Sequence, residues 1–365
     1  MKSCQIPSVS TTQCLSRSLL LLGLSLGLAI ALPHTPTPAQ GLTIFNDQLQ
    51  LSERGPRPPS LAEAEANRLF REGRAAQEVG QITRAIGLWR AALEQYQSIY
   101  DLPAIGAVYD HIGFAYLELR DYQKAEDALR RSLAVASDLN DYSQQIYGYN
   151  NIGTLLLNNN SPVAAEETFR GGLAVARSIG DEPGEALSLS NLGLAIANQG
   201  RYAEAIEVYR QAWILRRRYP DTGGQANTLN NIGDAYAALE QYDQAVGEYR
   251  LARWYAQENG DLVNEFRALQ RLALNYAFNQ RWPQAFASLD DWVALAREQQ
   301  DLRQELRALH IYAQYYKFLG RWENSYALYN NAIAVAERLD DQEGLAILYS
   351  EREQIVHQFP FQTFR

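Results

Sequence analysis

A repeat of 40 residues is the feature that most constrains how this chain can fold. Steps of 40 along the sequence meet small residues on one register, namely Gly73, Gly113, Gly153, Gly193, Gly233, Ala273 and Ala313. A second small column lies twelve places later, at Ala85, Ala125, Ala165, Ala205, Ala245, Ala285 and Ser325. A third column is acidic, at Asp101, Asp141, Asp181, Asp221, Asp261, Asp301 and Asp341. Three columns in phase without gaps indicate a solenoid of stacked units.

Each unit reads as two helices, here called A and B. Apolar or small residues of the second unit follow one another in steps of three and four, from Tyr109 through Ile112 and Gly113 to Tyr116, which is the spacing of one helix face. A second such run follows the break at Arg120-Asp121. We expect helices A near 61–79, 103–119, 143–159, 183–199, 223–239, 263–279 and 303–319. We expect helices B near 82–98, 122–138, 162–178, 202–218, 242–258, 282–298 and 322–338, and a closing helix over 343–358.

The small columns and the acidic column have different structural roles in this interpretation. Gly113 and Ala125 would let paired helices approach closely, and a large residue there would overpack the crossing by about 1–3 kcal/mol. The acidic column falls between helix B and the next helix A, where an Asp side chain accepts hydrogen bonds from free amides. Gly or Asn before it suits the left-handed position that ends a helix. Capping is therefore favoured over metal binding or chemistry for these Asp residues.

The sequence resembles tetratricopeptide repeats. The motif has a large apolar residue, Leu-Gly, Tyr, then Ala, an aromatic residue and Ala. The second unit supplies Tyr109, Ile112-Gly113, Tyr116, Ala125, Leu129 and Ser132, and the fifth supplies Leu229, Ile232-Gly233, Tyr236, Ala245, Tyr249 and Ala252. The usual period is about 34 residues, so this longer form is similar to the repeats of kinesin light chains and spindle-orientation adaptors.

The resemblance implies a fold and a kind of partner. It implies an all-α chain, a right-handed α-solenoid of about seven helix-turn-helix units over 61–342 and a capping helix within 343–365. The unbroken register favours one elongated domain with a core in which each unit contacts its neighbours. In tetratricopeptide superhelices the helices A line a concave groove that binds a peptide or protein segment. Groove-facing positions lie at −6, −3, −2, +1 and +5 from the Gly column.

The first 60 residues read as a secretory signal (1–39) and a Pro-rich linker (40–60). Residues 18–32 are apolar but shorter than the roughly 20 residues of a membrane span, so a cleaved signal is favoured over a retained anchor. Cleavage after Ala31 and after Ala39 are both compatible with the sequence. The chain is therefore expected to be exported by a bacterium, to the periplasm, the thylakoid lumen or the medium. Cys4 and Cys14 would leave with the signal.

Charge and motifs exclude several function classes. The formal net charge is −9, which argues against nucleic acid and anionic membrane surfaces as main partners. His34, His111, His310 and His357 have no metal-ligand spacing, and no phosphate-binding loop or nucleophile elbow is present. We therefore expect no cofactor, no metal and no enzymatic activity.

An Asn ladder is the first candidate binding feature. It consists of Asn150, Asn151, Asn191, Asn227, Asn230 and Asn231. Asn is a mediocre helix former, and its amide matches the peptide groups of an extended segment. The long-repeat proteins that this chain resembles use such Asn residues to hold the backbone of a partner. The alternative is that these amides hydrogen-bond between neighbouring helices and stabilise the stack.

An Arg cluster is the second candidate. Arg267 and Arg271 lie one turn apart on one helix A, and Arg303 and Arg307 repeat that spacing on the next. Guanidinium groups on one face could bind carboxylates in a bidentate manner. The alternative is pairing within the chain, with Glu265, Glu305 or Asp301.

Two functions remain at this point. The first is an exported, non-enzymatic scaffold that binds a peptide or protein segment through the Asn ladder and the Arg cluster. The alternative is a structural or self-assembling module without a peptide ligand, in which the array or the Phe-rich tail 359–365 contacts other copies.

Overall fold

The computed structural model describes residues 60–219 and 221–358, and the regular structure in these ranges is α-helix alone. The helices are α3 (Leu61–Glu78), α4 (Ile82–Ser98), α5 (Leu102–Glu118), α6 (Tyr122–Asp138), α7 (Tyr142–Asn158), α8 (Pro162–Ile179), α9 (Glu182–Asn198), α10 (Tyr202–Arg216), α11 (Thr222–Ala238), α12 (Tyr242–Asn259), α13 (Leu262–Phe278), α14 (Trp282–Glu298), α15 (Leu302–Phe318), α16 (Trp322–Arg338) and α17 (Gln342–Gln358). Their bounds agree with the predicted ranges to within two residues, so the all-α prediction and the closing helix are confirmed.

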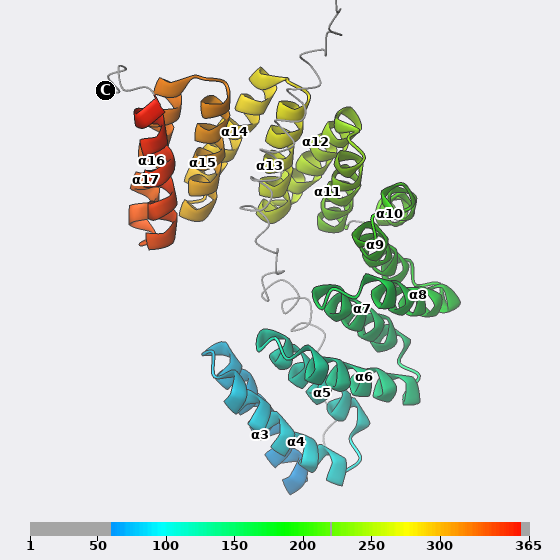
Figure 1. Ribbon diagram of the computed structural model, residues 1–365. Helices are drawn as coiled ribbons and strands as arrows, with labels where there is room; N and C mark the ends of the chain where they lie inside the picture. Colours follow the sequence, from blue (N-terminus) through cyan, green and yellow to red (C-terminus); the bar gives the residue numbers. More distant parts are fainter. Residues whose placement is uncertain (1–59, 220, 359–365) are drawn as a thin grey trace, which may run out of the picture. The chain divides into compact units, whose positions relative to one another are not determined.

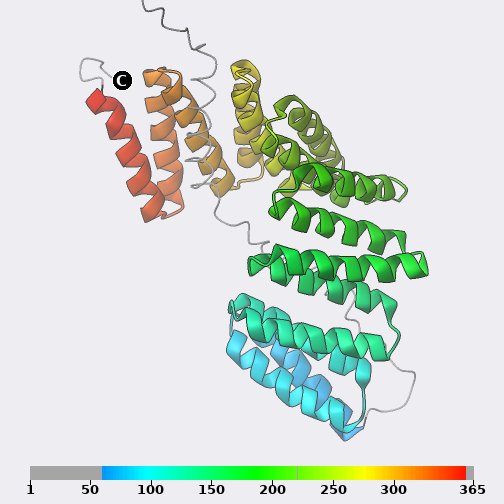
Figure 2. The same cartoon turned by 45° about the vertical axis from the view of Figure 1, so that its right-hand side comes forward.

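The described helices form two compact units, α3–α10 and α11–α17. In each unit, helix A packs against the helix B that follows it, and helix B packs against the next helix A. Figures 1 and 2 show these helices as antiparallel hairpins that lie side by side within each unit. Helices A also contact each other across hairpins, α7 with α9 and α11 with α13. The core of each unit is therefore a layer that continues from one hairpin to the next.

The Gly column permits close packing inside each hairpin. A Cβ atom on Gly153 would lie 2.3 Å from the Phe169 ring, and one on Gly233 would lie 2.5 Å from the Tyr249 ring. Phe169 and Tyr249 are fully buried, so neither ring has room to move away. The predicted close approach is confirmed, and the residue that needs the space is the large side chain sixteen places later on helix B.

The acidic column caps the helices A. Asp141 accepts a hydrogen bond from the amide of Gln144 at 3.0 Å, and Asp341 accepts one from Gly344 at 2.9 Å. Asp101, Asp181, Asp221, Asp261 and Asp301 make the same contact with the amide three residues later. Each satisfies an amide that the first turn of a helix leaves free. The capping role predicted for this column is confirmed.

Left-handed residues follow both the helices A and the helices B. In the described ranges a positive φ recurs every 20 residues, and the non-Gly cases include Arg120 at 58°, Glu240 at 59° and Gln280 at 57°. The sequence predicted this conformation only after helix B, where Gly or Asn signals it. After helix A the same turn is made by Gly80, Gly200 and Gly320 and, in the other repeats, by charged or amide residues, because the helix end requires this conformation whichever residue occupies it.

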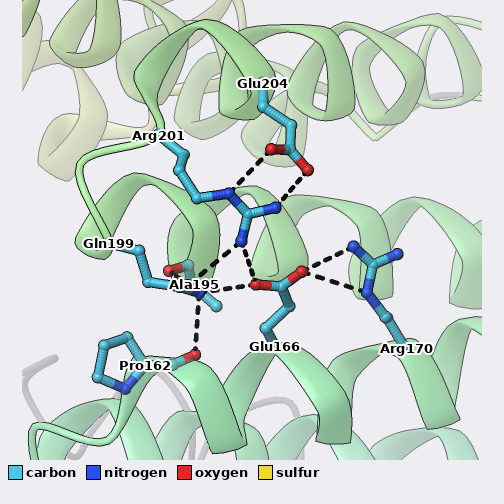
Figure 3. Close-up of polar contacts among 7 residues, drawn as sticks. All are labelled: Pro162, Glu166, Arg170, Ala195, Gln199, Arg201 and Glu204. Carbon is cyan, nitrogen blue, oxygen red and sulfur yellow. Dashed lines mark hydrogen bonds and ion pairs between the residues drawn. The ribbon is translucent and has the colours of Figure 1, made fainter.

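Glu166 on α8 joins two hairpins through charge (Figure 3). Its carboxylate accepts hydrogen bonds from Arg170 of its own helix, from Gln199 after α9 and from Arg201 before α10, each at 2.7 Å. Burial acts to raise the pKa of Glu166, but these three donors lower it below its usual value. Arg201 also binds Glu204 at 2.6 Å. The α7–α8 hairpin is thus linked to the α9–α10 hairpin by the Glu166–Arg201 ion pair and the Gln199 hydrogen bond as well as by the apolar layer.

Several predictions lie outside the described residues. They are the signal and linker over 1–59, both cysteines, and the tail 359–365. The division of the chain into signal, linker and array therefore stays a prediction. Among the helices that the structure describes, none combines the length and the apolar character that crossing a membrane requires.

Candidate functional site: the polar face of the helices A

The Asn residues of the α3–α10 unit divide between the helix-packing layer and the surface. Asn150 on α7 is 3% exposed; its Nδ2 donates to the Ser188 hydroxyl on α9 at 2.9 Å, and its Oδ1 accepts from Asn191 Nδ2 at 2.8 Å. Asn151 and Asn191 are partly exposed. Nδ2 of Asn151 is itself buried without a hydrogen-bond partner in the described ranges. Asn150 thus fits the alternative interpretation, in which the amide joins neighbouring helices.

Asn230 of the α11–α17 unit has the same position in its repeat and also bonds the next helix A, through a different partner. It is fully buried, and its Nδ2 donates to the side-chain and main-chain oxygens of Asn264 on α13, at 3.2 and 3.3 Å. Asn150, Asn230 and Asp110 all lie three residues before the Gly column, and all are buried. The −3 position therefore points into the packing layer. Direct contact with a partner is wrong for Asn150 and Asn230, because no part of a ligand can reach them without separating the helices.

Arg267 is the centre of the polar face in the second unit. Its Nη1 donates to Asn227 Oδ1 at 3.0 Å, and its Nη2 donates to Asn231 Oδ1 and to Asp234 Oδ2, both at 2.6 Å. These three partners lie on α11, one turn apart along the helix, whereas Arg267 comes from α13. The guanidinium thus gathers two of the predicted Asn residues and one Asp that the sequence analysis did not name.

Asp234 holds a second Arg in place. Arg271 lies one turn beyond Arg267 on α13, and its Nε is 2.9 Å from Asp234 Oδ1, in an ion pair too bent to be a hydrogen bond. The buried Tyr249 of α12 donates its hydroxyl proton to the same Oδ1 at 2.7 Å. Burial acts to raise the pKa of Asp234, but the charges of Arg271 and Arg267 and the Tyr249 hydroxyl bring it below its usual value. Asp234 is therefore ionised at neutral pH and neutralises part of this Arg pair.

The intramolecular pairing that the sequence suggested involves other partners than those predicted. Asp301 caps α15, Glu305 binds Arg297 at 2.6 Å, and Glu265 accepts from Gln257 at 2.7 Å. Pairing of Arg267 and Arg271 with these acidic residues is wrong. Asp234 takes that role because it lies at +1 from the Gly column, which is a groove-facing position; reading that column would have identified it.

Arg307 differs from its counterpart Arg267. It occupies the same register on the next helix A, α15, but it is exposed and has no hydrogen bond or ion pair within the described residues. His310, one turn on, lies with its Nε2 2.5 Å from Glu351 Oε2 of α17. The Arg cluster therefore contains two Arg residues that Asp234 anchors, Arg267 and Arg271, and two exposed ones on α15, Arg303 and Arg307, without an ion pair in the described ranges.

The described residues hold no group of three or more His, Cys, Asp or Glu side chains placed to bind a metal ion. The polar face can donate hydrogen bonds and carry charge. A stack of helical hairpins whose helices A present such a face defines a class of proteins, the helical-repeat scaffolds, and this fold is typical of scaffolds that bind other proteins.

Comparison with known proteins identifies the repeat. The model of the tetratricopeptide repeat matches residues 64–138 and 185–253. A model described as anaphase-promoting complex subunit 5 matches residues 112–193, 227–314 and 305–356. These segments are one to about two 40-residue units long, so both models follow the same repeat. The chain belongs to the tetratricopeptide-repeat family, whose scaffold members are generally non-enzymatic.

Solved structures with the same fold come from distant proteins. Aspartyl phosphate phosphatase F from Bacillus subtilis has a TM-score of 0.55 at 15% identity, over 90% of this chain and 85% of its own. The apo form of RapI has a TM-score of 0.54 at 14% identity, over 76% and 99%. A signal transduction ATPase with numerous domains from Pyrococcus horikoshii, which carries a tetratricopeptide repeat sensor, has a TM-score of 0.56 at 17% identity, over 81% and 43%. Identities this low show the fold alone. The search of curated proteins found no match.

Proposed function

We propose that this protein is an exported, non-enzymatic scaffold that binds a peptide or protein segment on the helices A of the α11–α17 unit. The supporting observation is that Asn227 and Asn231 have NH₂ groups, and Arg271 and Arg307 have terminal guanidinium nitrogens, that make no hydrogen bond within the described residues. A ligand that matches them must supply acceptors, and an extended polypeptide with acidic side chains supplies both carbonyl and carboxylate oxygens.

Arg267 bonds the side-chain oxygens of the neighbouring Asn residues and leaves their NH₂ groups as hydrogen-bond donors. Because Arg267 occupies the Oδ1 atoms of Asn227 and Asn231, the NH₂ group of each remains without a partner in the described part of the chain. Asn227 is exposed and Asn231 partly exposed. These two NH₂ groups lie one turn apart on α11, and each can donate to a main-chain carbonyl of a bound segment.

The two remaining Arg residues supply positive charge. Arg271 uses its Nε for Asp234, and its terminal nitrogens make no hydrogen bond within the described residues. Arg307 is exposed and unpaired. Asp234 pairs with both Arg267 and Arg271, and Arg307 adds a further positive charge on the next helix A, in a chain whose net charge is −9. A guanidinium binds a carboxylate in a bidentate manner, so a partner segment with Asp or Glu side chains fits this face best.

The test combines Asn231→Ala with Arg307→Glu in the mature chain. Neither side chain is buried, so the double variant should keep its fold, which far-UV circular dichroism verifies. The matched control is Arg338→Glu, the same charge reversal at an exposed Arg on the helix B α16. Proteins captured from an extracytoplasmic extract by the wild type and by the control, but lost from the double variant, support the proposal. An unchanged set of captured proteins would contradict it.

Export is tested separately from binding. N-terminal sequencing of the protein recovered from the extracytoplasmic fraction should begin after Ala31 or after Ala39. Recovery of the full-length chain in the membrane fraction would instead support a retained anchor. Light scattering of the purified chain tests the alternative, self-assembling function, which would give a mass of two or more copies.

A further inference from the structure

A column of Arg residues on the helices B contains one member without a partner. The column recurs every 40 residues, at Arg90, Arg130, Arg170, Arg210 and Arg250. Arg130 and Arg170 each bind the Glu one turn earlier at 2.7 Å, as Figure 3 shows for Arg170. Arg90 donates to the Tyr116 hydroxyl at 2.7 Å, and Arg210 has an interaction of its own. Arg250 is exposed and has neither an ion pair nor a hydrogen bond within the described ranges.

Arg250 lines a groove between two helices B. The groove has a volume of about 410 Å³ and runs between α12 and α14, with α13 as its floor. Leu272 and Tyr276 form the apolar floor, and Trp254 forms part of the wall. The indole of Trp254 is 51% exposed and makes an edge contact with Tyr255 at 4.7 Å. We call this site the Trp254 groove; all of it lies within the α11–α17 unit.

The equivalent groove in the other unit is smaller, and its own side chains contact one another across it. It lies between α4 and α6 over α5, four repeats earlier, and measures about 210 Å³. There Arg90 binds the Tyr116 hydroxyl, and Lys124 lies 5.4 Å from the Tyr116 ring. In the Trp254 groove the corresponding Arg250 and Tyr276 make no such contact. The same place in the repeat thus has about half the volume in the α3–α10 unit that it has in the α11–α17 unit.

The charge of the Trp254 groove is positive. Arg253 donates to Asp291 Oδ2 at 2.7 Å, which neutralises the one acidic side chain among the lining residues. Arg253 Nε is buried without a hydrogen-bond partner, 3.8 Å from Glu265 Oε1. Arg250 is left as an uncompensated cation at the rim, beside the exposed indole. An apolar floor next to a free guanidinium favours an occupant that has both an apolar side chain and a carboxylate.

We propose that the Trp254 groove is a second protein-binding surface, which takes an acidic segment of a partner protein. An aromatic or large apolar side chain of that segment enters between α12 and α14, onto Leu272 and Tyr276, and an adjacent Asp or Glu binds Arg250. The half-exposed Trp254 offers an indole face on which a side chain of a bound polypeptide can pack. Trp, Tyr and Arg are also the residues that dominate binding energy at protein interfaces. This site is separate from the face of the helices A and does not rest on it.

The experiment uses a displayed library of random short peptides, selected on the immobilised mature chain. Selected peptides should contain an aromatic or large apolar residue beside Asp or Glu. Their affinity should fall about tenfold or more in Arg250→Ala and in Trp254→Ala. Both side chains are exposed, so the variants should keep the thermal melting curve of the wild type.

Two control variants give the experiment its specificity. Arg90→Ala removes the Arg of the same column in the smaller groove, and Arg307→Glu changes the face of the helices A; both should leave the affinity of these peptides unchanged. Selected peptides without the acidic and apolar pair, or equal affinity for the wild type and the Arg250→Ala/Trp254→Ala variant, would overturn the proposal. A dimer that dissociates on Trp254→Ala would also overturn it, since a second copy would then be the occupant.

Discussion

Asp110 and His111 are adjacent buried residues whose titrations should offset each other. Both lie on α5 and are 5% exposed. Burial raises the pKa of Asp110 from its usual 3.8 to about 7, although a hydrogen bond with Ser132 acts in the other direction. Burial lowers the pKa of His111 from 6.5 to about 4, and the charge of Arg74 adds to this. Between pH 4 and 6.5 the folded chain therefore holds a proton on Asp110 and none on His111.

The two residues change stability with pH in opposite directions. The raised pKa of Asp110 gives stability that is complete below pH 3.8 and is lost as the pH rises to about 7. The lowered pKa of His111 gives stability that is complete above pH 6.5 and is lost as the pH falls to about 4. At about 1.4 kcal/mol per pH unit, the upper limits are about 4 kcal/mol for Asp110 and about 3 kcal/mol for His111. In the wild type the two slopes should cancel between pH 4 and 6.5, because the unfolded chain binds the same number of protons, on His111.

Single substitutions should reveal each slope. The unfolding free energy of Asp110→Asn minus that of the wild type should increase by up to about 4 kcal/mol as the pH rises from 4 to 7. The unfolding free energy of His111→Gln minus that of the wild type should decrease by up to about 3 kcal/mol as the pH rises from 4 to 6.5. Other titrating groups cancel in these differences.

The assay is urea unfolding followed by far-UV circular dichroism, at several pH values, for the wild type, both variants and the double variant. The double variant should show neither slope. If the Asp110→Asn difference were constant from pH 4 to 7, Asp110 would titrate near its usual pKa and the reasoning from burial would be refuted. His111 contacts the Phe70 and Trp89 rings, with centroids 4.9 and 5.0 Å away, so His111→Gln also has a pH-independent cost that leaves the slope unaffected.

Three further substitutions test the architecture and the polar face by thermal or urea unfolding. Gly153→Ala should cost about 1–3 kcal/mol, because its Cβ would lie 2.3 Å from a buried Phe169 ring, whereas Gly87→Ala, with nothing within 4 Å, should be neutral or stabilising; equal effects would contradict the packing argument. Glu240→Gly should stabilise by about 1 kcal/mol, because φ is 59° there, and a loss of stability would show that the Glu side chain matters more than the backbone. Asp234→Asn should cost about 1–3 kcal/mol at neutral pH, and this cost should shrink as the pH falls through the lowered pKa of Asp234; a cost that persists in acid would show that charge is not its cause.

The sequence predicted the parts of this structure that depend on local chemistry. The helix bounds follow from 3.6-residue periodicity, and the caps follow from Asp before each helix A, because both signals act within a few residues. The small residues at Gly153 and Gly233 predicted close packing. Their partners, Phe169 and Tyr249, lie on the facing helix B at a fixed number of residues along the repeat. The regular period is therefore related even to this tertiary contact.

The polar face required the tertiary structure. Asn150 and Asn151 are neighbours in sequence, but a helix turns about 100° between them, so Asn150 enters the packing layer and Asn151 reaches the surface. Whether Arg267 is free or paired depends on which side chain of α11 lies opposite it, and that proved to be Asp234. The repeat by itself determined that helices stack and where each one begins and ends. Only the packing of neighbouring hairpins decided which polar side chains are used within the stack and which, such as Arg250 and Arg307, are exposed without an ion pair in the described ranges.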